Sequence, residues 1–265
     1  MDQTVLITPL GWERDRASLL AQDLRVHRAY LLYRTDHMEN RKFVAMVKKD
    51  LEDKGTEVRL VELNNTREFE SVMLNVSKII VEENTKQNIV YVNMSASGKI
   101  AAAATTIASM FHRDKIKSLI YVAASKYAFQ EKDPMKAFNE HGLVIGMAGR
   151  YSPPLFHIER PPEPILGAIV ELYESGPMKY SKLLDALTEQ KVPGFESVNY
   201  PPTSDFSNRK REISKWTGRL RRRILDPAEK YIEIVSSHEG PEKVVRLTRE
   251  GEHLAILTGM VSSLK

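Results

Sequence analysis

The chain has 265 residues, of which 42% are hydrophobic and 28% charged, with a formal net charge of +4 and no cysteine. The absence of cysteine excludes disulfides, thiolate metal sites and a cysteine nucleophile. We expect no secretory leader, because charged residues appear early in the sequence, and its longest weakly polar stretch, residues 100–111, is shorter than the roughly 20 residues of a membrane span. We therefore expect a soluble cytoplasmic protein with two modest cores.

Residues 1–150 alternate short apolar runs with longer amphipathic stretches. Apolar residues at consecutive positions, as at 90–92 and 119–122, are typical of strands buried on both faces of a parallel sheet. The alternation predicts an α/β fold with a doubly wound, mostly parallel Rossmann-like sheet and right-handed crossovers. The predicted strands cover residues 4–10, 28–34, 56–64, 87–95 and 117–125, and the predicted helices cover residues 13–24, 39–55, 67–84 and 98–114.

Residues 151–164 hold five prolines and predict a linker between two domains, at residues 1–150 and 165–265. Three helices followed by a β-hairpin are the order of elements in a winged helix-turn-helix, whose third helix enters the DNA major groove. The second domain is therefore predicted to be a winged helix-turn-helix DNA-binding domain. Its predicted elements are helices at residues 163–176, 179–190 and 206–225, a hairpin at 231–248 and a closing helix at 249–264.

Two loops that follow predicted strands carry unusual chemistry, at residues 8–16 (TPLGWERDR) and 93–99 (NMSASGK). In open α/β sheets, ligands bind beyond the carboxyl ends of the strands, near the point where the strand order reverses. The chain has no G-x-x-x-x-G-K-[ST] motif and no G-x-G-x-x-G motif. This argues against Mg²⁺-dependent nucleotide hydrolysis and against a nicotinamide or flavin oxidoreductase.

The loop at residues 93–99 leads into an alanine-rich helix, and two interpretations of it stay open. Gly98 lets the backbone approach a ligand, Ser95 and Ser97 offer hydroxyl groups, and Lys99 falls in the first helical turn. A lysine there is unfavourable by about 0.3–1 kcal/mol unless an anion is bound. The alternative is a simple strand-to-helix turn, in which Ser97 caps the helix and Lys99 faces solvent.

The two loops together resemble those of the CRISPR-associated Rossmann fold (CARF) domain. The proline-rich arm and winged helix that follow resemble the CARF–winged-helix transcriptional regulators of archaea and bacteria. The resemblance implies a homodimer that binds a cyclic nucleotide effector, such as cyclic tetra-adenylate or another cyclic oligoadenylate, across its two-fold axis. The ligand-binding residues that it implies are Leu10, Gly11, Trp12 and Arg16 from the first loop and Asn93, Ser95, Ser97, Gly98 and Lys99 from the second.

For Trp12, two places stay open: stacking on an adenine, or the hydrophobic core, which is the commoner place for a tryptophan after a strand.

The predicted helix at residues 206–225 carries a concentrated positive charge. Eight Lys or Arg residues and one acid lie between Arg209 and Arg223, whereas the rest of the chain from residue 153 holds nine basic and fifteen acidic residues. Ile213, Trp216 and Leu220 would form an apolar face opposite the basic one, as a helix packed on a small core requires, and a basic face backed by an apolar one suits a DNA-binding helix. A solvated charged face is the alternative. The predicted DNA-binding residues are Asn208, Arg209, Lys210, Arg211, Lys215, Arg219, Arg222 and Arg223.

We therefore predict a ligand-responsive transcriptional regulator that binds double-stranded DNA. One alternative is an enzyme, a slow metal-independent ring nuclease that degrades cyclic oligoadenylate, with Lys99 as its candidate catalytic residue. Another is that the winged helix binds protein instead of DNA. We expect no metal site, because no two of the seven histidines stand four residues apart beside a carboxylate, and no membrane partner.

Overall fold

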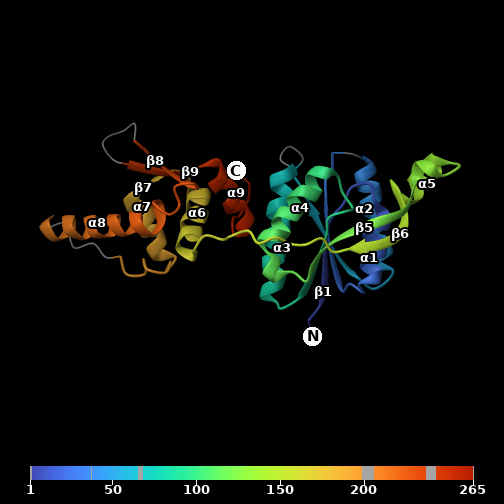
Figure 1. Ribbon diagram of the computed structural model, residues 1–265, viewed down its shortest axis with the longest axis horizontal. Coiled ribbons are helices and arrows are strands. Elements are labelled where there is room, and N and C mark those ends of the chain that lie inside the picture. Colours follow the sequence, from blue (N-terminus) through green and yellow to red (C-terminus); the bar gives the residue numbers. More distant parts are fainter. Residues whose placement is uncertain (1, 37, 65–67, 199–205, 237–242, 265) are drawn as a thin grey trace. The chain divides into compact units, whose positions relative to one another are not determined.

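The computed structural model describes residues 2–36, 38–64, 68–198, 206–236 and 243–264. The chain forms two compact units, Met1–Ile158 (unit 1) and Glu159–Lys265 (unit 2) (Figure 1). Among the described residues, no helix is both long and apolar enough to cross a membrane. In the same part of the chain, no group of three or more His, Cys, Asp or Glu residues is arranged to hold a metal ion.

Unit 1 is built on a six-stranded sheet with the strand order β3-β2-β1-β4-β5-β6. Strands β1 to β5 run parallel, and β6 pairs antiparallel with β5. The chain order reverses between β1 and β4, where Ile7 and Val92 are paired in register and fully buried. The prediction of a mostly parallel, Rossmann-like sheet is therefore confirmed. The strands are β1 (Thr4–Pro9), β2 (Arg28–Tyr33), β3 (Glu57–Glu62), β4 (Ile89–Asn93), β5 (Ser118–Tyr127) and β6 (Val144–Tyr151).

Helices cover both faces of this sheet. Helices α1 and α2 pack together on one face, and α3 and α4 pack together on the other (Figure 1). The inward face of α4 is made of small residues, since Ala101, Ala104 and Ala108 are at most 2% exposed, and small side chains allow close packing. The helices are α1 (Arg14–Asp23), α2 (Met38–Glu52), α3 (Glu68–Thr85) and α4 (Lys99–Phe111).

The segment between β5 and β6 contains structure that the sequence did not predict. A 3₁₀ turn, η2 (Ala128–Gln130), is followed by helix α5 (Pro134–His141) and then by β6. Asp133 caps α5, because its carboxylate accepts a hydrogen bond of 3.0 Å from the backbone N–H of Lys136. Strand β6 lies at the edge of the sheet and is mostly half-buried or exposed, and Gly146 and Gly149 interrupt its apolar residues, which weakens the signal of a strand.

Unit 2 combines helices with a small antiparallel sheet in the order β7-β9-β8. The basic helix spans residues 206–225 as expected, and its last part is a π-helical turn. Strand β7 was not predicted, because two residues are too short to show a periodic pattern. The elements are α6 (Glu163–Ser175), β7 (Met178–Lys179), α7 (Tyr180–Glu189), α8 (Phe206–Leu220), the π-helical turn η3 (Arg221–Leu225), β8 (Ile232–Ser236), β9 (Lys243–Leu247) and α9 (Arg249–Thr258).

The apolar face of the basic helix differs from the predicted one. Trp216 and Leu220 are buried as expected, but Ile213 is 43% exposed. The buried face continues instead to Ile224, so its residues recur every four positions. The prediction is wrong at Ile213 because the part of α8 that precedes Trp216 extends beyond the core of unit 2.

Candidate ligand pocket and basic helix

The two loops singled out in the sequence meet at the carboxyl edge of the sheet in unit 1. The backbone N–H of Gly11 donates a hydrogen bond of 2.8 Å to the carbonyl of Ala96. The N–H of Leu10 donates one of 2.7 Å to the carbonyl of Leu32, at the end of β2. The first loop is therefore tied both to the second loop and to β2. This is the position next to the β1/β4 reversal where open α/β sheets bind ligands.

Asn93 and Ser95 form a buried support beneath these loops. The Asn93 Oδ1 accepts hydrogen bonds from the backbone N–H and the hydroxyl of Ser95, at 3.0 and 2.6 Å. The Ser95 hydroxyl in turn accepts one of 3.0 Å from the N–H of Val122, and Asn93 Nδ2 donates to the carbonyl of Arg16. Both side chains are buried and fully engaged inside the protein, so the structure does not bring them to the pocket surface, where direct ligand contact was expected.

Arg16 also lies behind the pocket instead of lining it. Its guanidinium is buried, forms an ion pair of 2.5 Å with Glu13 and donates a hydrogen bond of 3.0 Å to the carbonyl of Ser95. Burial raises the pKa of Glu13 above its ordinary value, although the charge and hydrogen bond of Arg16 lower it. Arg16 thus joins the two loops from below and balances the charge of Glu13.

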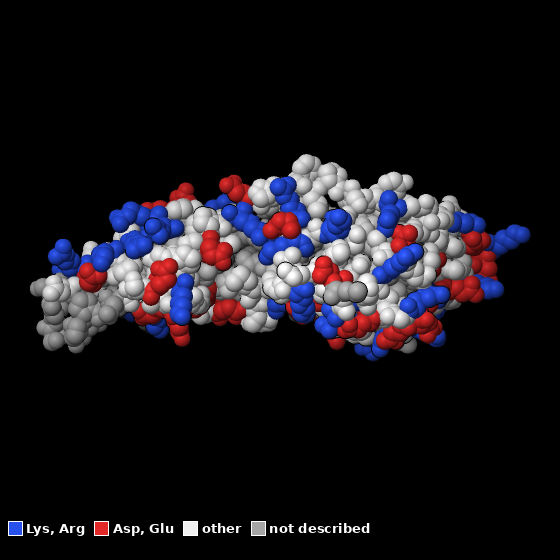
Figure 2. All heavy atoms as spheres, turned by 90° about the horizontal axis from the view of Figure 1, so that it is seen from below, with Lys and Arg blue, Asp and Glu red and all other residues white. Residues whose placement is uncertain are grey.

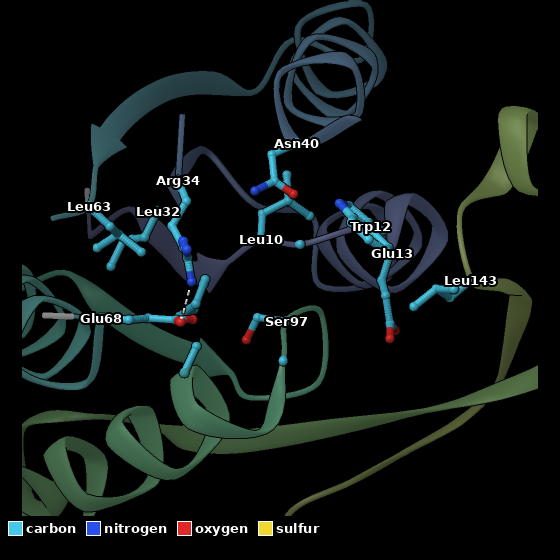
Figure 3. A pocket seen from close by; sticks show the side chains of 14 residues that line it. Leu10, Trp12, Glu13, Leu32, Arg34, Asn40, Leu63, Glu68, Ser97 and Leu143 are labelled. Atoms are coloured by element: carbon cyan, nitrogen blue, oxygen red, sulfur yellow. Dashed lines mark hydrogen bonds and ion pairs between the residues drawn. The ribbon is translucent and has the colours of Figure 1, made fainter. Parts of the chain in front are cut away.

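A pocket of about 320 Å³, called here the loop pocket, opens between the two loops and the neighbouring strand ends (Figure 3). It contains five of the nine predicted ligand residues. Its walls are largely apolar, which is usual for a small-molecule site. The lining residues are Pro9, Leu10, Gly11, Trp12, Glu13, Leu32, Arg34, Asn40, Leu63, Glu68, Ser97, Gly98, Ala101 and Leu143.

Trp12 lies on the wall of the loop pocket and not in the core. Its side chain is 36% exposed, and its ring packs edge-on against Phe138 of α5, with 6.0 Å between the ring centroids. The N–H of Leu143 donates a hydrogen bond of 2.8 Å to the Trp12 carbonyl. The structure therefore excludes the core as the place of Trp12, and stacking on an adenine stays a prediction.

Sequence reasoning missed several polar residues of the loop pocket. Arg34 follows β2 directly and forms an ion pair of 2.6 Å with Glu68, at the start of α3, and another with Asp36. Asn40 extends from the first turn of α2. Arg34 could have been found by the same rule that selected the two loops, because it stands at the carboxyl end of a parallel strand. Asn40 and Glu68 lie within predicted helices and gave no such signal.

Helix α4 begins beside the loop pocket with no side-chain cap. Its N-cap residue is Gly98, in an extended conformation, and not Ser97 as the alternative interpretation required. The buried hydroxyl of Ser97 has no hydrogen-bond partner among the described residues. Lys99 is exposed at the first position of α4. The free N–H groups and positive dipole end of a helix start favour an anion.

The basic residues of unit 2 gather along α8 and η3. Figure 2 shows Lys and Arg side chains concentrated over the α8 part of this unit, at the left of the view. Asn208, Lys210, Arg211, Lys215, Arg222 and Arg223 are exposed. The side chain of Arg209 lies outside the described part of the chain, as do residues 237–242, which form most of the predicted wing.

Two of the predicted DNA-binding residues are partly engaged within unit 2. Lys215 forms an ion pair of 3.0 Å with Glu212. The guanidinium of Arg219 lies over the ring of Trp216, 5.3 Å from its centroid, and 6.0 Å from the centroid of Phe195. Hydrogen bonds from backbone N–H groups, with smaller contributions from the charges of Arg219 and Arg223, lower the pKa of Glu196.

Unit 1 is thus a Rossmann-like α/β fold with a pocket at the reversal point of its sheet. A family model described as "HFX_2341_N:-like, N-terminal" matches residues 4–127. No curated protein matches the chain.

Several solved structures are similar to the chain. One is Csm6 of Enterococcus italicus bound to cyclic hexa-2'-fluoro-hexa-dAMP, with 13% identity and a TM-score of 0.41 over 87% of this chain and 58% of that one. Another is a type III CRISPR defence DNA nuclease activated by cyclic oligoadenylate, with 15% identity and a TM-score of 0.35 over 76% and 31%. A third is Can2 of Sulfobacillus thermosulfidooxidans in complex with cyclic tetra-adenylate, with 14% identity and a TM-score of 0.36 over 98% and 64%. The chain therefore spans less than two thirds of each of these three chains.

Proposed function

We propose that the chain is a ligand-responsive regulator, in which unit 1 is a CARF-like sensor of a cyclic oligoadenylate or related nucleotide and unit 2 is a winged helix-turn-helix that binds double-stranded DNA. The protein acts as a homodimer, because a cyclic ligand with two-fold symmetry suits an isologous pair of subunits. The observation that carries the proposal is the meeting of the two loops around a pocket that the Ser97 hydroxyl lines, a buried group with no hydrogen-bond partner among the described residues. It agrees with the loop resemblance seen in the sequence.

The start of α4 supports a phosphate-bearing ligand. Gly98 leaves open space beside the backbone, since a Cβ placed there would meet no atom within 4 Å. Lys99 makes no hydrogen bond or ion pair with the described residues, so its charge is available to a ligand. Free backbone N–H groups, a positive helix end and a lysine together form a favourable environment for a phosphate.

The arrangement of unit 2 supports DNA binding. Three helices precede a β-hairpin, the third helix carries exposed cations, and β7 joins the hairpin as a third strand. Small sheets of this kind accompany the recognition helix in winged helix-turn-helix domains. The exposed arginines of η3 are suited to phosphate contacts, which supply most of the affinity of a protein for DNA of any sequence.

Calorimetric titration tests the sensor half of the proposal. We expect cyclic tetra-adenylate or cyclic hexa-adenylate to bind with a micromolar or lower Kd, at one ring per two chains. Lys99→Ala should weaken binding, whereas Lys117→Ala should not. Lys117 is a matched control, because it is also exposed but precedes β5 at the opposite edge of the sheet. If neither ring produces heat, unit 1 is not a sensor of cyclic oligoadenylates.

Fluorescence anisotropy with duplex DNA from upstream of the gene tests the other half. We expect an affinity that falls steeply with salt concentration. The slope of the logarithm of the binding constant against the logarithm of the salt concentration should be about −0.9 for each phosphate neutralised. Arg222→Glu combined with Arg223→Glu should abolish binding. Unchanged DNA affinity in this variant would favour the alternative in which unit 2 binds protein.

Ligand cleavage is a second candidate activity, favoured by Glu13. This carboxyl lines the loop pocket, and burial raises its pKa, as is common for groups that transfer protons. Incubation with cyclic tetra-adenylate followed by chromatography should reveal linear products if unit 1 is a ring nuclease. Glu13→Gln should then slow cleavage more than it weakens binding.

A further inference from the structure

Asn40 is an unexplained polar residue inside the loop pocket. Only 7% of the residue is exposed, and its carboxamide makes no hydrogen bond with any of the described residues. The carboxamide points from α2 into the space that Arg34, Glu68 and Ser97 border from the other side (Figure 3). Because buried polar atoms in proteins are nearly always paired, the buried Ser97 hydroxyl, which has no partner among the described residues, indicates a missing polar group in the space that the Asn40 carboxamide also faces.

The charged groups that line the loop pocket are already neutralised. Arg34 is paired with Glu68 and with Asp36, and Glu13 is paired with Arg16. A phosphate inside the pocket would have to compete with these carboxylates. The remaining walls are mainly apolar, with four leucines beside a proline, a tryptophan and an alanine. The interior therefore suits an uncharged, flat and partly apolar group, whereas the free cation Lys99 lies outside, at the start of α4.

The size of the loop pocket further limits which chemical group can bind inside it. Its volume of about 320 Å³ is at the lower end of the roughly 300–1,000 Å³ that small-molecule sites occupy. A whole cyclic oligonucleotide does not fit in that space, but one heterocyclic base does. A carboxamide offers one donor and one acceptor side by side, which matches the edge of an adenine with its N6–H donor and N7 acceptor.

We propose that Asn40 is a specificity-determining residue that recognises a purine base in the loop pocket, while the phosphates remain outside at Gly98 and Lys99. The inference rests on the proposed function, in which the base is an adenine of the cyclic oligoadenylate. Asn40 Nδ2 donates to the ring nitrogen, and Oδ1 accepts from the exocyclic amino group. Ser97 supplies a further hydroxyl to the bound base or ribose.

The test is calorimetric titration of the full chain with AMP, GMP and cyclic tetra-adenylate, at millimolar concentration for the mononucleotides. The wild-type chain should prefer AMP to GMP. Asn40→Asp replaces the donor with an acceptor, so AMP affinity should fall by about 5- to 150-fold, the range of a good bidentate pair. The preference should shift toward GMP, whose N1–H and N2–H are adjacent donors. Asn40→Leu should lose affinity for both.

Asn139→Asp is the matched control, with the same change of charge. Asn139 is exposed on α5, where it accepts a hydrogen bond from Lys42, and it does not line the loop pocket. Asn40→Asp should fold normally, because an aspartate is favoured in the first turn of a helix; equal melting temperatures will check this.

The outcomes separate the inference from the proposed function. If Asn40→Asp binds cyclic tetra-adenylate and AMP as the control does, the inference is overturned and the sensor function stands. If AMP binding depends on Asn40 but neither cyclic ring binds, the inference stands and the proposed function fails. If the wild-type chain binds none of the nucleotides, both are overturned.

Discussion

Glu83 shows how a single buried charge is stabilised in unit 1. Its carboxylate is completely buried and accepts hydrogen bonds of 2.6 Å from both Tyr30 and Asn88, and Arg28 lies 3.1 Å away. Burial by itself would raise the pKa of Glu83. The two hydrogen bonds and the charge of Arg28 together outweigh burial and lower the pKa below its ordinary value.

This environment predicts a pH-dependent contribution to stability. Because the folded pKa of Glu83 is lowered, its contribution is fully present above the unfolded pKa of about 4.5 and is lost as the pH falls through the folded pKa. Glu83→Gln should lower the free energy of unfolding by about 3 kcal/mol at pH 7, and the difference should shrink at pH 3. Urea unfolding at both pH values measures it.

The matched control for Glu83→Gln is Glu82→Gln, which changes an exposed ion pair with Lys86 and should cost less than about 1 kcal/mol. A difference between wild type and Glu83→Gln that stays constant with pH would contradict the assignment.

Gly142 determines how α5 meets the first loop. Its φ of 90° lies in the region that favours glycine, and an added Cβ would overlap the carbonyl group of Trp12. Gly142→Ala should therefore destabilise the fold by more than the strain of about 1–3 kcal/mol expected from the backbone angle alone, and should weaken nucleotide binding by displacing Trp12.

Gly55→Ala separates backbone strain from steric overlap, the two effects that Gly142→Ala combines. Gly55 has a similar φ of 82° but open space around it, so its alanine variant reports strain without overlap. Thermal unfolding and nucleotide titration of both variants should show the larger loss for Gly142→Ala. Equal losses in stability and unchanged nucleotide affinity would refute the role assigned to Gly142.

At the scale of the element, the arginines of the basic helix differ in role: one packs against the core of unit 2 and another is exposed. Arg219 is half-buried over the rings of Trp216 and Phe195, whereas Arg222 is exposed in η3. The two positions are three residues apart, and in the sequence they looked equivalent. The difference arises because the loop that carries Phe195 covers only one side of the helix.

We expect Arg219→Ala to lower the free energy of unfolding by about 1 kcal/mol through the lost cation–π contacts. Arg222→Ala should leave stability within about 0.5 kcal/mol and reduce the salt slope of DNA binding by about one. Chemical unfolding measures the stability of both variants, and fluorescence anisotropy measures the salt slope of their DNA binding. A loss of stability in Arg222→Ala equal to that in Arg219→Ala would show that the exposed arginine also packs.

At the scale of the whole molecule, the proposed function requires the two units to influence each other. A ligand changes the DNA affinity only through its different affinities for two states of the protein. We expect saturating cyclic tetra-adenylate to change DNA affinity by a factor between about 5 and 150, and DNA to change ligand affinity by the same factor. Anisotropy of labelled DNA with and without ligand measures the first factor, and calorimetry of the ligand with and without DNA measures the second. In Lys99→Ala, both effects should disappear. Independent binding of the two partners would refute regulation by ligand.

The sequence by itself determined the location of both loops and the order of the elements, except for the segment after β5 and the short strand β7. The buried strands β1, β2, β4 and β5 and the basic helix at residues 206–225 were predicted because hydrophobic periodicity is local and directly reflects which residues are buried. The meeting of the two loops followed from one topological rule, since parallel strands place their carboxyl ends at the same edge.

Only the tertiary structure decided which side chains face the loop pocket. Asn93, Ser95 and Arg16 belong to the predicted loops but form hydrogen bonds beneath them, whereas Asn40 and Arg34 enter the pocket from other elements. The physical reason is that a polar side chain in a loop either supports the backbone or stays free for a ligand. Which of these occurs depends on partners brought together from distant parts of the chain, as Val122 is brought to Ser95.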